Sequence, residues 1–597
     1  MGLPFWGDMK KAKQKDVISS MFFSVALAMI LTQVVGVSAV IIDGMITSRA
    51  VEPEAFSAFS LISPLISMFG LFAAFVSAGC QIVSSELTGC GKKDETNRAL
   101  TFSLIFALLM SAILILASLL IPNALMTICG VSHSKYPELR PLMLDYLHGY
   151  LFGVPFYMLI QVLGPVIVMD GGKKRFTLSS FVFCIVDILG DLVAALVLKA
   201  GIFGIGLASS FAYVVQFIIL ALHFFTKNCT LRLTSKHLDK KRVGEIFKSG
   251  SPAFVRKAFT VLRDLLTNNI NIAVAISAAA IAARGIQHDL NLLMFCTGLG
   301  LGRALLSMTG VYYSANDRQG LRRLFIYSMR VSGLLSFTVG AVVFIFARLI
   351  SLIYTSDPEV IELSVFSIRF MAISLPFDTM AVSYTSYLQA VNNRKLVNIF
   401  NFFERFLIPV ITAFVMGRFF GSKGVLASLA VCKIILILVL FVIVWIHAKR
   451  FPRDANDYMY LPKDFGGDES DNLYSSIVTM DDVIAEREKV EKFCRDHGTS
   501  EADALHTALF IEEMAGNVVQ HGGMDGKSSI DYRLSVIDGT ITLTIRDYCA
   551  RFDPMLYLEE NNSDPEKVMG IAIVKNLAKD VRYFNAFNSN NVIIAIE

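Results

Sequence analysis

Residues 177–225 read TLSSFVFCIVDILGDLVAALVLKAGIFGIGLASSFAYVVQFIILALHFF, two apolar stretches divided by the short break KAG at 199–201. Each stretch approaches the length of about 20 residues that an α-helix needs to cross a bilayer. Stretches of this kind recur up to residue 448, so the sequence predicts twelve transmembrane helices. They are expected near 17–43, 55–79, 98–121, 142–168, 177–198, 203–225, 252–277, 289–312, 325–350, 363–388, 397–420 and 424–448.

The whole chain has the composition of a membrane protein with a soluble addition. Of its 597 residues, 54% are hydrophobic and 17% are charged, which excludes an entirely soluble protein. The apolar part up to residue 449 carries a net charge of roughly +16 and the remainder roughly −12. We therefore expect a basic segment (1–16), a first lobe of six helices (17–225), an inter-lobe loop (226–251), a second lobe of six helices (252–448), a linker (449–472) and a soluble domain (473–597).

The order and charge of the loops predict a topology. An even number of spans puts both termini on one side of the membrane, and Lys and Arg gather in the loops of that side, so both termini are expected to be cytoplasmic. The two lobes also resemble each other, since Pro155 pairs with Pro376 and Lys174 with Lys395 at the same offset. Internal repeats of this kind are typical of secondary transporters, which bind substrate between the repeats.

Ionisable side chains inside apolar spans are costly, so they are candidate functional residues. In the first lobe Asp187 and Asp191 lie four residues apart on one helix face, and Asp43 lies at a similar depth in the first span. Three carboxylates in one pocket cannot all ionise cheaply, which predicts a site for H⁺ or Na⁺. The second lobe adds three candidates for lining a substrate cavity, Asp264, Asp378 and Glu404.

Several segments resemble the multidrug and toxic compound extrusion (MATE) family of transporters. They include VIIDGMITSRAVEPEAFSAFSL, VSAGCQIVSSELTGCGKKDE, VDILGDLVAALVLKAGIFGIGLASS and LIYTSDPEVIELSVFSIRFMAISLPF, and the resemblance covers residues 17–448. It implies an all-α body of two pseudo-symmetric six-helix lobes that exports cationic or amphipathic organic compounds in exchange for H⁺ or Na⁺. It also implies that Asp43 and Asp191 are coupling carboxylates, whereas Asp187 stands where the family usually has Asn.

The soluble domain alternates strands and helices in an order that predicts an α+β fold. We expect strands near 474–478, 528–537, 540–547, 581–587 and 591–596, and helices near 480–497, 500–521 and 570–580. The second helix, in ALFIEEMAGNVVQHGG, places Glu513, Asn517 and His521 on one face. Glu and Asn side chains suit a magnesium ion and a water molecule beside a phosphate.

Together with TIRDYCARFDP and VMGIAIVKNLAKDVRY, this helix resembles the GHKL ATPase fold in its anti-sigma-factor serine-kinase branch. The resemblance implies Mg-ATP as a ligand, with Glu513 as the base or water-positioning group, Asn517 as the magnesium ligand and Asp547 as the acceptor for the adenine amino group. It also implies that Gly570 lies at the N-terminus of the phosphate-binding helix.

Cys549 and Arg551 depart from this pattern, because they stand where the GHKL motif has glycines. Whether the domain is a degenerate ATPase or serine kinase, and hence an enzyme at all, is left open.

The interpretation from sequence is an antiporter in a bacterial plasma membrane that its cytoplasmic domain regulates. The expected partners are a small organic substrate, the lipid bilayer and a cytoplasmic protein bound to the domain, with no nucleic acid. One alternative is a flippase for a lipid-linked sugar, which a basic cavity would favour. Others are a membrane sensor with the soluble domain as its output, or a domain that only stabilises the chain. We expect the acidic domain to dock on the basic loop Lys227–Lys248.

Overall fold

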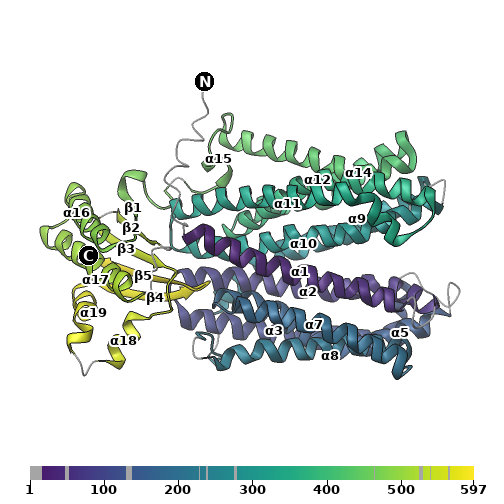
Figure 1. Ribbon diagram of the computed structural model, residues 1–597, viewed down its shortest axis with the longest axis horizontal. Helices are drawn as coiled ribbons and strands as arrows, with labels where there is room; N and C mark the ends of the chain where they lie inside the picture. Colours follow the sequence, from purple (N-terminus) through teal and green to yellow (C-terminus); the bar gives the residue numbers. More distant parts are fainter. Residues whose placement is uncertain are drawn as a thin grey trace.

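The chain folds into a long helical bundle, the body, with a smaller α+β domain, the tail, at one end (Figure 1). The computed structural model describes residues 17–47, 53–128, 138–226, 229–236, 239–274, 278–462, 464–522, 529–537, 539–561 and 565–596. The helices of the body run along its long axis, so each has one end near the tail and one end far from it (Figure 1).

The first lobe consists of helices α1 to α8. Their bounds are Val17–Ile46 (α1), Pro53–Gly89 (α2), Lys93–Leu120 (α3), Pro122–Ile128 (α4), Leu139–Leu151 (α5), Val154–Met169 (α6), Lys173–Leu192 (α7) and Gly201–Ala221 (α8). Helices α5 and α6 form one span that is bent by 50°. The bend falls beside Pro155, because proline lacks the backbone donor that a continuous helix would need there and is accommodated best in the first turn of a helix. Helix α7 runs on into a π-helical turn, Val193–Val197.

The second lobe consists of helices α9 to α14. Their bounds are Lys240–Val274 (α9), Ala278–Ser314 (α10), Arg318–Tyr354 (α11), Pro358–Ala390 (α12), Arg394–Phe402 (α13) and Ile408–Ala448 (α14), with a π-helical turn at Phe403–Leu407 between the last two. At Gly421 the backbone has φ 59° and ψ −145°, which is not helical. Glycine accepts this conformation without a steric penalty, so the chain turns there and α14 holds the end of one span and the whole of the next.

The number of spans agrees with the prediction once two features are considered. Among the described residues, nine helical segments are long and apolar enough to cross a membrane, and the bent pair α5–α6 is a tenth. The break at Gly421 divides one of these segments into two spans. Helix α9 has the length of a span but a low hydropathy, because it carries many charged residues, and it packs along α2 inside the body. The body therefore has twelve spans in two lobes of six.

Among the helix pairs that join the lobes, α1 with α10 and α2 with α9 have the most extensive contacts. Glycines allow the backbones to approach closely in both pairs. A Cβ at Gly250 would collide with the carbonyl of Phe75, and a Cβ at Gly300 would collide with the backbone of Ile30. Buried residues of both lobes accordingly form one continuous hydrophobic cluster.

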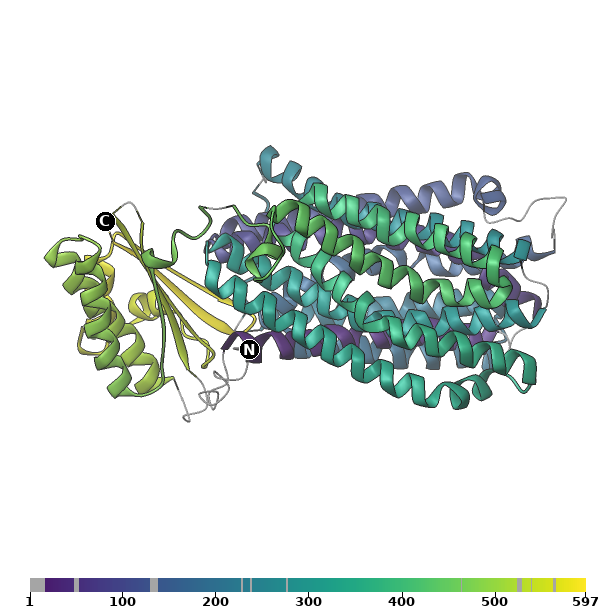
Figure 2. The ribbon, with the colours of Figure 1, turned by 90° about the horizontal axis from the view of Figure 1, so that it is seen from above.

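The tail has one antiparallel five-stranded sheet in the order β1–β2–β3–β5–β4. The strands are Asn472–Ile477 (β1), Ile530–Ile537 (β2), Thr540–Asp547 (β3), Asp580–Ala586 (β4) and Ser589–Ile596 (β5), close to the predicted positions. Helices α16 (Met480–Asp496), α17 (Glu501–His521) and α19 (Pro565–Leu577) cover one face, and the sheet lies between its helices and the body (Figure 2). A short helix, α18 (Pro554–Glu560), lies where the sequence predicts neither a helix nor a strand.

Side chains alternate between the two faces of this sheet, as the strand period requires. Leu534 of β2 and Ile545 of β3 lie in the tail's own core, beneath its helices. Their neighbours Arg533 and Arg546 point the other way and contact the body. The sheet thus serves both as a layer of the tail's core and as the surface that docks on the body.

The linker reaches the tail along α12. Its short helix α15, Asn456–Met459, is held by two tyrosines of α12. The hydroxyl of Tyr384 donates to the carbonyl of Tyr458 (2.9 Å), and that of Tyr387 to the carbonyl of Met459 (3.1 Å). The tail is therefore attached to the second lobe through an ordered segment.

Candidate functional site

The three predicted carboxylates of the first lobe lie together. Asp43 comes from α1, and Asp187 and Asp191 come from the same face of α7, with one oxygen of each within 4.8 Å of the others. All three side chains are buried, at 4%, 1% and 0% exposure. Their burial follows from the packing of α1 against α7 and from the four-residue spacing on α7.

The carboxylate oxygens in this cluster have an unusual lack of partners. Within the described part of the chain, Asp43 Oδ1, Asp187 Oδ1 and both oxygens of Asp191 are buried without a hydrogen-bond partner. Buried polar atoms are nearly always paired, so these oxygens are suited to a proton or to a metal cation that prefers oxygen ligands. The π-helical turn after Asp191 widens α7 at this level, and such turns occur often at functional sites.

The second lobe has a cluster of a different kind, in which acidic and basic side chains are paired. Lys433 of α14 forms an ion pair with Asp378 of α12 and lies 3.6 Å from the carboxylate of Glu404. Arg405 Nη2 lies 2.7 Å from Glu404 Oε1, and its guanidinium lies over the ring of Phe295, 4.7 Å from the ring centre. Two of the three predicted residues, Asp378 and Glu404, are thus brought together.

The third predicted residue, Asp264, belongs to α9, but the surroundings of its side chain lie outside what the structure describes. It is nevertheless the repeat counterpart of Asp43, because the offset between these two residues equals that between Pro155 and Pro376.

The sequence-based prediction included only acidic residues and omitted the basic residues inside the second lobe. Lys433, Arg256 of α9 and Arg303 of α10 all lie within helices of the body. The signal was available, since a Lys or Arg inside an apolar span is as costly as an Asp. Lys433 stands in the run LASLAVCKIILILVLF, where it is the only charged residue.

A second group with metal-ligating side chains lies where the first lobe meets the inter-lobe loop. It consists of Asp170, His223 and Cys229, again within 4.8 Å of one another. Asp170 accepts hydrogen bonds from His223 Nε2 (2.9 Å) and from the backbone N–H of Thr230 (3.1 Å). Its oxygens are therefore satisfied by the protein, and the group fixes the start of the loop.

In the tail, Glu513 of α17 contacts Gly570 of α19. A Cβ at position 570 would overlap the Glu513 carboxylate, so glycine is needed there for the two helices to approach. The expectation that Gly570 begins a helix is wrong, because α19 already starts at Pro565. Asn517 lies one turn further along α17 and is half-buried.

Asp547, at the end of β3, is held within the tail. Its Oδ1 accepts hydrogen bonds from the N–H of Cys549 and from Asn590 Nδ2, each at 2.9 Å. Burial raises the pKa of Asp547, although these hydrogen bonds oppose the shift. The Cys549 sulfur packs at the end of α17, 3.1 Å from the position of a Cβ on Gly522. The side chain that replaces a motif glycine therefore occupies space between β3 and α17.

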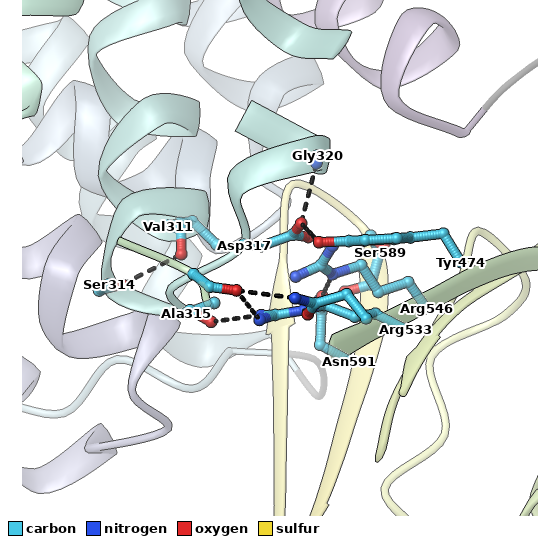
Figure 3. Close-up of polar contacts among 12 residues, drawn as sticks. Val311, Ser314, Ala315, Asp317, Gly320, Tyr474, Arg533, Arg546, Ser589 and Asn591 are labelled. Atoms are coloured by element: carbon cyan, nitrogen blue, oxygen red, sulfur yellow. Dashed lines mark hydrogen bonds and ion pairs between the residues drawn. The ribbon is translucent and has the colours of Figure 1, made fainter. Parts of the chain in front are cut away.

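The tail docks on the second lobe at the connection between α10 and α11. Asp317 in this connection accepts hydrogen bonds from the N–H of Gly320 (2.8 Å) and the Tyr474 hydroxyl (3.3 Å), and it forms an ion pair with Arg546 (Figure 3). Arg533 donates to the carbonyl of Ala315 (3.2 Å). Burial alone would raise the pKa of Asp317, but the charges of Arg546 and Arg533 hold it below its ordinary value.

The tail docks on the first lobe through the turn between β4 and β5. The two turn residues, Phe587 and Asn588, both have positive φ, at 57° and 65°. The N–H of Phe587 donates to the carbonyl of Met169 at the end of α6 (2.7 Å), and the Phe587 ring is buried in the core of the body. The Asn588 side chain fills the space beside Gly171, where a Cβ would collide with it.

Further polar contacts surround this turn. Arg582 donates to the carbonyl of Cys90 (3.2 Å), and Lys93 forms an ion pair with Asp553 (3.1 Å). Lys173 donates to the hydroxyl of Tyr548 (3.0 Å). The tail therefore contacts both lobes at the same end of the body.

The docking surface differs from the one expected from net charge. In the basic loop, Arg242 pairs with Glu95 (3.2 Å) and Glu245 (2.7 Å) of the body, while Lys240 and Lys241 are exposed. The tail's contacts described above lie instead on the connections α2–α3, α6–α7 and α10–α11. The expectation that the loop's basic side chains hold the tail is therefore wrong for the described residues, although Thr230 and Leu231 at the start of the loop line a pocket together with Phe584 and Asn585 of the tail.

Comparison with known families identifies both parts of the chain. Residues 28–193 and 252–415 match the family model MatE, one segment in each lobe, as an internal repeat requires. Residues 478–596 match the model of the histidine kinase-like ATPase domain.

Individual relatives agree with the family models. The multidrug export protein MepA of Staphylococcus haemolyticus (strain JCSC1435) is 23% identical over 410 residues, which cover 67% of this chain and 87% of MepA. MepA of Staphylococcus aureus (strain NCTC 8325) is 23% identical over 416 residues, 68% of this chain and 89% of that protein.

Solved structures share the fold of the body. A MATE transporter in complex with MaD3S superimposes with a TM-score of 0.66 at 18% identity, covering 71% of this chain and 94% of that one. An outward-facing multidrug resistance MATE family transporter gives a TM-score of 0.66 at 17% identity, with the same coverage. The chain therefore belongs to the MATE family of membrane transporters and carries a C-terminal histidine kinase-like ATPase (GHKL) domain.

Proposed function

We propose that the chain is a secondary antiporter that exports organic compounds in exchange for H⁺ or Na⁺ bound by Asp43, Asp187 and Asp191. The proposal rests on one observation, the three buried carboxylates whose unpartnered oxygens lie within one coordination sphere. Such a cluster repels itself unless a proton or cation neutralises it. Loading this cluster would favour one of the two arrangements of the lobes and so couple ion movement to substrate movement.

Purified protein in liposomes tests the antiporter. An imposed pH gradient or sodium gradient, applied separately, should drive dye movement, and Asp191→Asn should abolish it. Asp187→Asn should shift the dependence on pH or sodium without abolishing transport, since it removes only one of three charges. Asp145→Asn, at an exposed position of α5, is the matched control. Transport by Asp191→Asn at the wild-type rate would contradict the coupling site.

We further propose that the tail regulates transport from the cytoplasmic side, where both termini would also lie. This proposal is supported by the contacts of the tail with both lobes, through Phe587 on the first and Arg546 on the second. In alternating access the lobes must separate at one end and then at the other. A docked tail that bridges both lobes would favour the arrangement in which they are close at this end.

Mg-ATP is the proposed ligand of the tail, bound by Asn517 and Asp547, with Glu513 beside the phosphates. Its effect would reach the body along β3, because Asp547 follows Arg546 directly in the chain. Transport by the full chain, with and without Mg-ATP, should differ from transport by a chain that ends after Pro452. Equal rates under all of these conditions would point instead to a tail that binds a cytoplasmic protein.

A further inference from the structure

The second lobe holds more positive than negative charge at one level inside the body. Among the described residues, Arg256, Arg303, Arg405 and Lys433 have two carboxylates near them, Asp378 and Glu404, and Arg263 adds a further positive charge within electrostatic range of Asp378. Counted at 1.5 Å per residue from the helix ends nearest the tail, the first six groups lie roughly 15 to 24 Å deep. This depth is close to the middle of a bilayer.

The two carboxylates are already occupied. Lys433 pairs with Asp378 and also lies near Glu404, which Arg405 contacts as well. Neither carboxylate is therefore free to balance another cation. The Arg405 side chain is only 5% exposed, yet its Nε has no hydrogen-bond partner among the described residues.

Among the described residues, two arginines at this level form no ion pair, Arg256 and Arg303. Arg303 has one long hydrogen bond, 3.4 Å to Gln161 Oε1. The guanidinium of Arg256 makes no ion pair or hydrogen bond within the described ranges. Arg405 and Arg303 lie within electrostatic range and repel it, and the attraction of Glu404, which Arg405 already contacts, is weaker than the repulsion of Arg405. Unpaired charges at this depth are costly, so the arrangement is unfavourable unless an anion completes it.

Arg303 lies at the seam between the lobes. Its backbone carbonyl accepts a hydrogen bond from Gln81 of α2 (3.0 Å), and its guanidinium contacts Gln161 of α6, so both partners belong to the first lobe. Transporters built from two repeats bind substrate at this interface. An anion that bound Arg303 would therefore contact residues that change neighbours when the lobes move.

We propose that the transported compound is an amphipathic organic anion whose charged group binds Arg256 and Arg303, with Arg405 beside them. Guanidinium groups bind carboxylate, phosphate and sulfonate through paired hydrogen bonds, which gives both affinity and orientation. This inference rests on the proposed antiporter function and names its substrate class. The proposed substrates are therefore anionic, whereas the sequence predicts cationic or amphipathic ones.

A pair of dyes with the same ring system but opposite charge tests the proposal. Fluorescein is an anion and rhodamine 123 a cation, and the binding of each to the full chain in detergent is followed by fluorescence anisotropy. Fluorescein should bind saturably and more tightly than rhodamine 123 by about tenfold or more. This comparison needs no variant, so it stands even if a substitution impairs folding. Tighter binding of rhodamine 123 would overturn the proposal.

Variants locate the site. Arg256→Gln and Arg303→Gln should each weaken fluorescein binding by about tenfold or more, as expected for loss of a charged hydrogen-bonding group. Arg303→Lys should retain more affinity than Arg303→Gln because it keeps the charge. Arg348→Gln, at an exposed position of α11, is the control and should bind like the wild type. Wild-type affinity in both glutamine variants would refute the assignment.

Two further measurements distinguish the anion site from the antiporter function and show whether the bound anion is a lipid or a soluble compound. If fluorescein binds as described but no gradient drives any dye across liposomes, the antiporter function fails and the anion site stands. If rhodamine 123 is transported normally by Arg256→Gln and Arg303→Gln, the anion site fails and the antiporter stands. Displacement of fluorescein by dihexanoyl phosphatidylglycerol would identify a lipid headgroup as the source, and binding without displacement a soluble anion; either result supports the anionic class.

Discussion

Arg546, near the end of strand β3, forms a buried ion pair with Asp317, the residue that caps helix α11 of the second lobe. The side chains are 10% and 1% exposed, so the pair is largely removed from water. The Arg546 guanidinium also lies over the ring of Tyr312, 4.6 Å from its centre. One side chain of the tail thus contacts both the end of α10 and the residue that caps α11.

Arg546→Ala should release the tail from the second lobe. It leaves the Asp317 carboxylate buried without its principal countercharge, a change that costs about 3–5 kcal/mol in buried pairs. Hydrogen exchange of the Phe587 amide, which bonds to Met169 of the body, reports docking and should become faster. Arg487→Ala, which breaks an exposed pair with Glu512, is the control and should leave that rate unchanged. An unchanged Phe587 amide in Arg546→Ala would show that the pair does not hold the tail.

Docking should be stable over a wide pH range and fail only in acid. The pKa of Asp317 is lowered in the docked state, because Arg546 and Arg533 outweigh the effect of burial. A lowered pKa adds stability above the pKa of the undocked group, about 3.9, and this stability is lost as pH falls through the docked value. The Phe587 amide, corrected for intrinsic exchange, should therefore keep its protection from pH 8 to pH 5. Loss of protection between pH 7 and pH 5 would assign docking to another group.

The docking surface shows what net charge cannot predict. The acidic tail was expected to meet the basic loop, yet its closest contact with the second lobe places tail arginines on a body aspartate. On the first lobe the charges are reversed, with Lys93 of the body on Asp553 of the tail. The net charge of a domain does not indicate which residues its fold places on the face that docks.

The carboxylate cluster of the first lobe was more accessible to prediction. Asp187 and Asp191 share a helix face by spacing alone, and Asp43 lies at the same depth in the first span. In the second lobe the sequence predicts Asp378 and Glu404 as acids that line a cavity, whereas the structure places Lys433, which was not predicted, beside both of them. Gly570 was misplaced because the helix it belongs to begins five residues earlier than its glycine suggests.

Phe587→Gly should weaken the docked full chain but not the isolated tail. A bulky residue at positive φ is strained by about 1–3 kcal/mol, so Phe587→Gly should raise or preserve the melting temperature of residues 470–597, which have a core of their own. In the full chain the same change removes a ring buried in the body and should weaken docking, as limited proteolysis within 461–471 would report. Asn588→Gly also relieves strain and removes the contact with Gly171 but keeps the ring, so it should weaken docking less than Phe587→Gly. If Phe587→Gly changed the stability of the isolated tail and of the full chain by the same amount, the Phe587 ring would not contribute to docking.

Lys433 should be required for stability mainly because of the charges around it. Lys433→Met leaves Asp378 and Glu404 without their shared cation and should destabilise the detergent-purified protein by about 3–5 kcal/mol. Adding Asp378→Asn should recover part of this loss, and the two changes should be strongly non-additive. The control is Lys423→Met, on the same helix as Lys433. It removes an exposed ion pair with Glu362 of α12 and should cost less than about 1 kcal/mol. Additive effects of Lys433→Met and Asp378→Asn would indicate that the pair is not coupled.

Nucleotide binding and docking should be linked in both directions. If Mg-ATP binds the tail at Asn517 and Asp547, nucleotide at 100 times its Kd should stabilise the isolated tail by about 2.7 kcal/mol, and Asn517→Ala should remove this effect. Arg546 lies next to Asp547, so bound nucleotide and the Arg546–Asp317 pair act on the same end of β3. Any change that nucleotide makes in docking must equal the change that docking makes in nucleotide affinity. The Kd for Mg-ATP should therefore differ between the full chain and Arg546→Ala. The factor between the two Kd values should equal the factor by which nucleotide changes the docking equilibrium. Equal Kd values in the two proteins would mean that nucleotide does not control the tail's hold on the body.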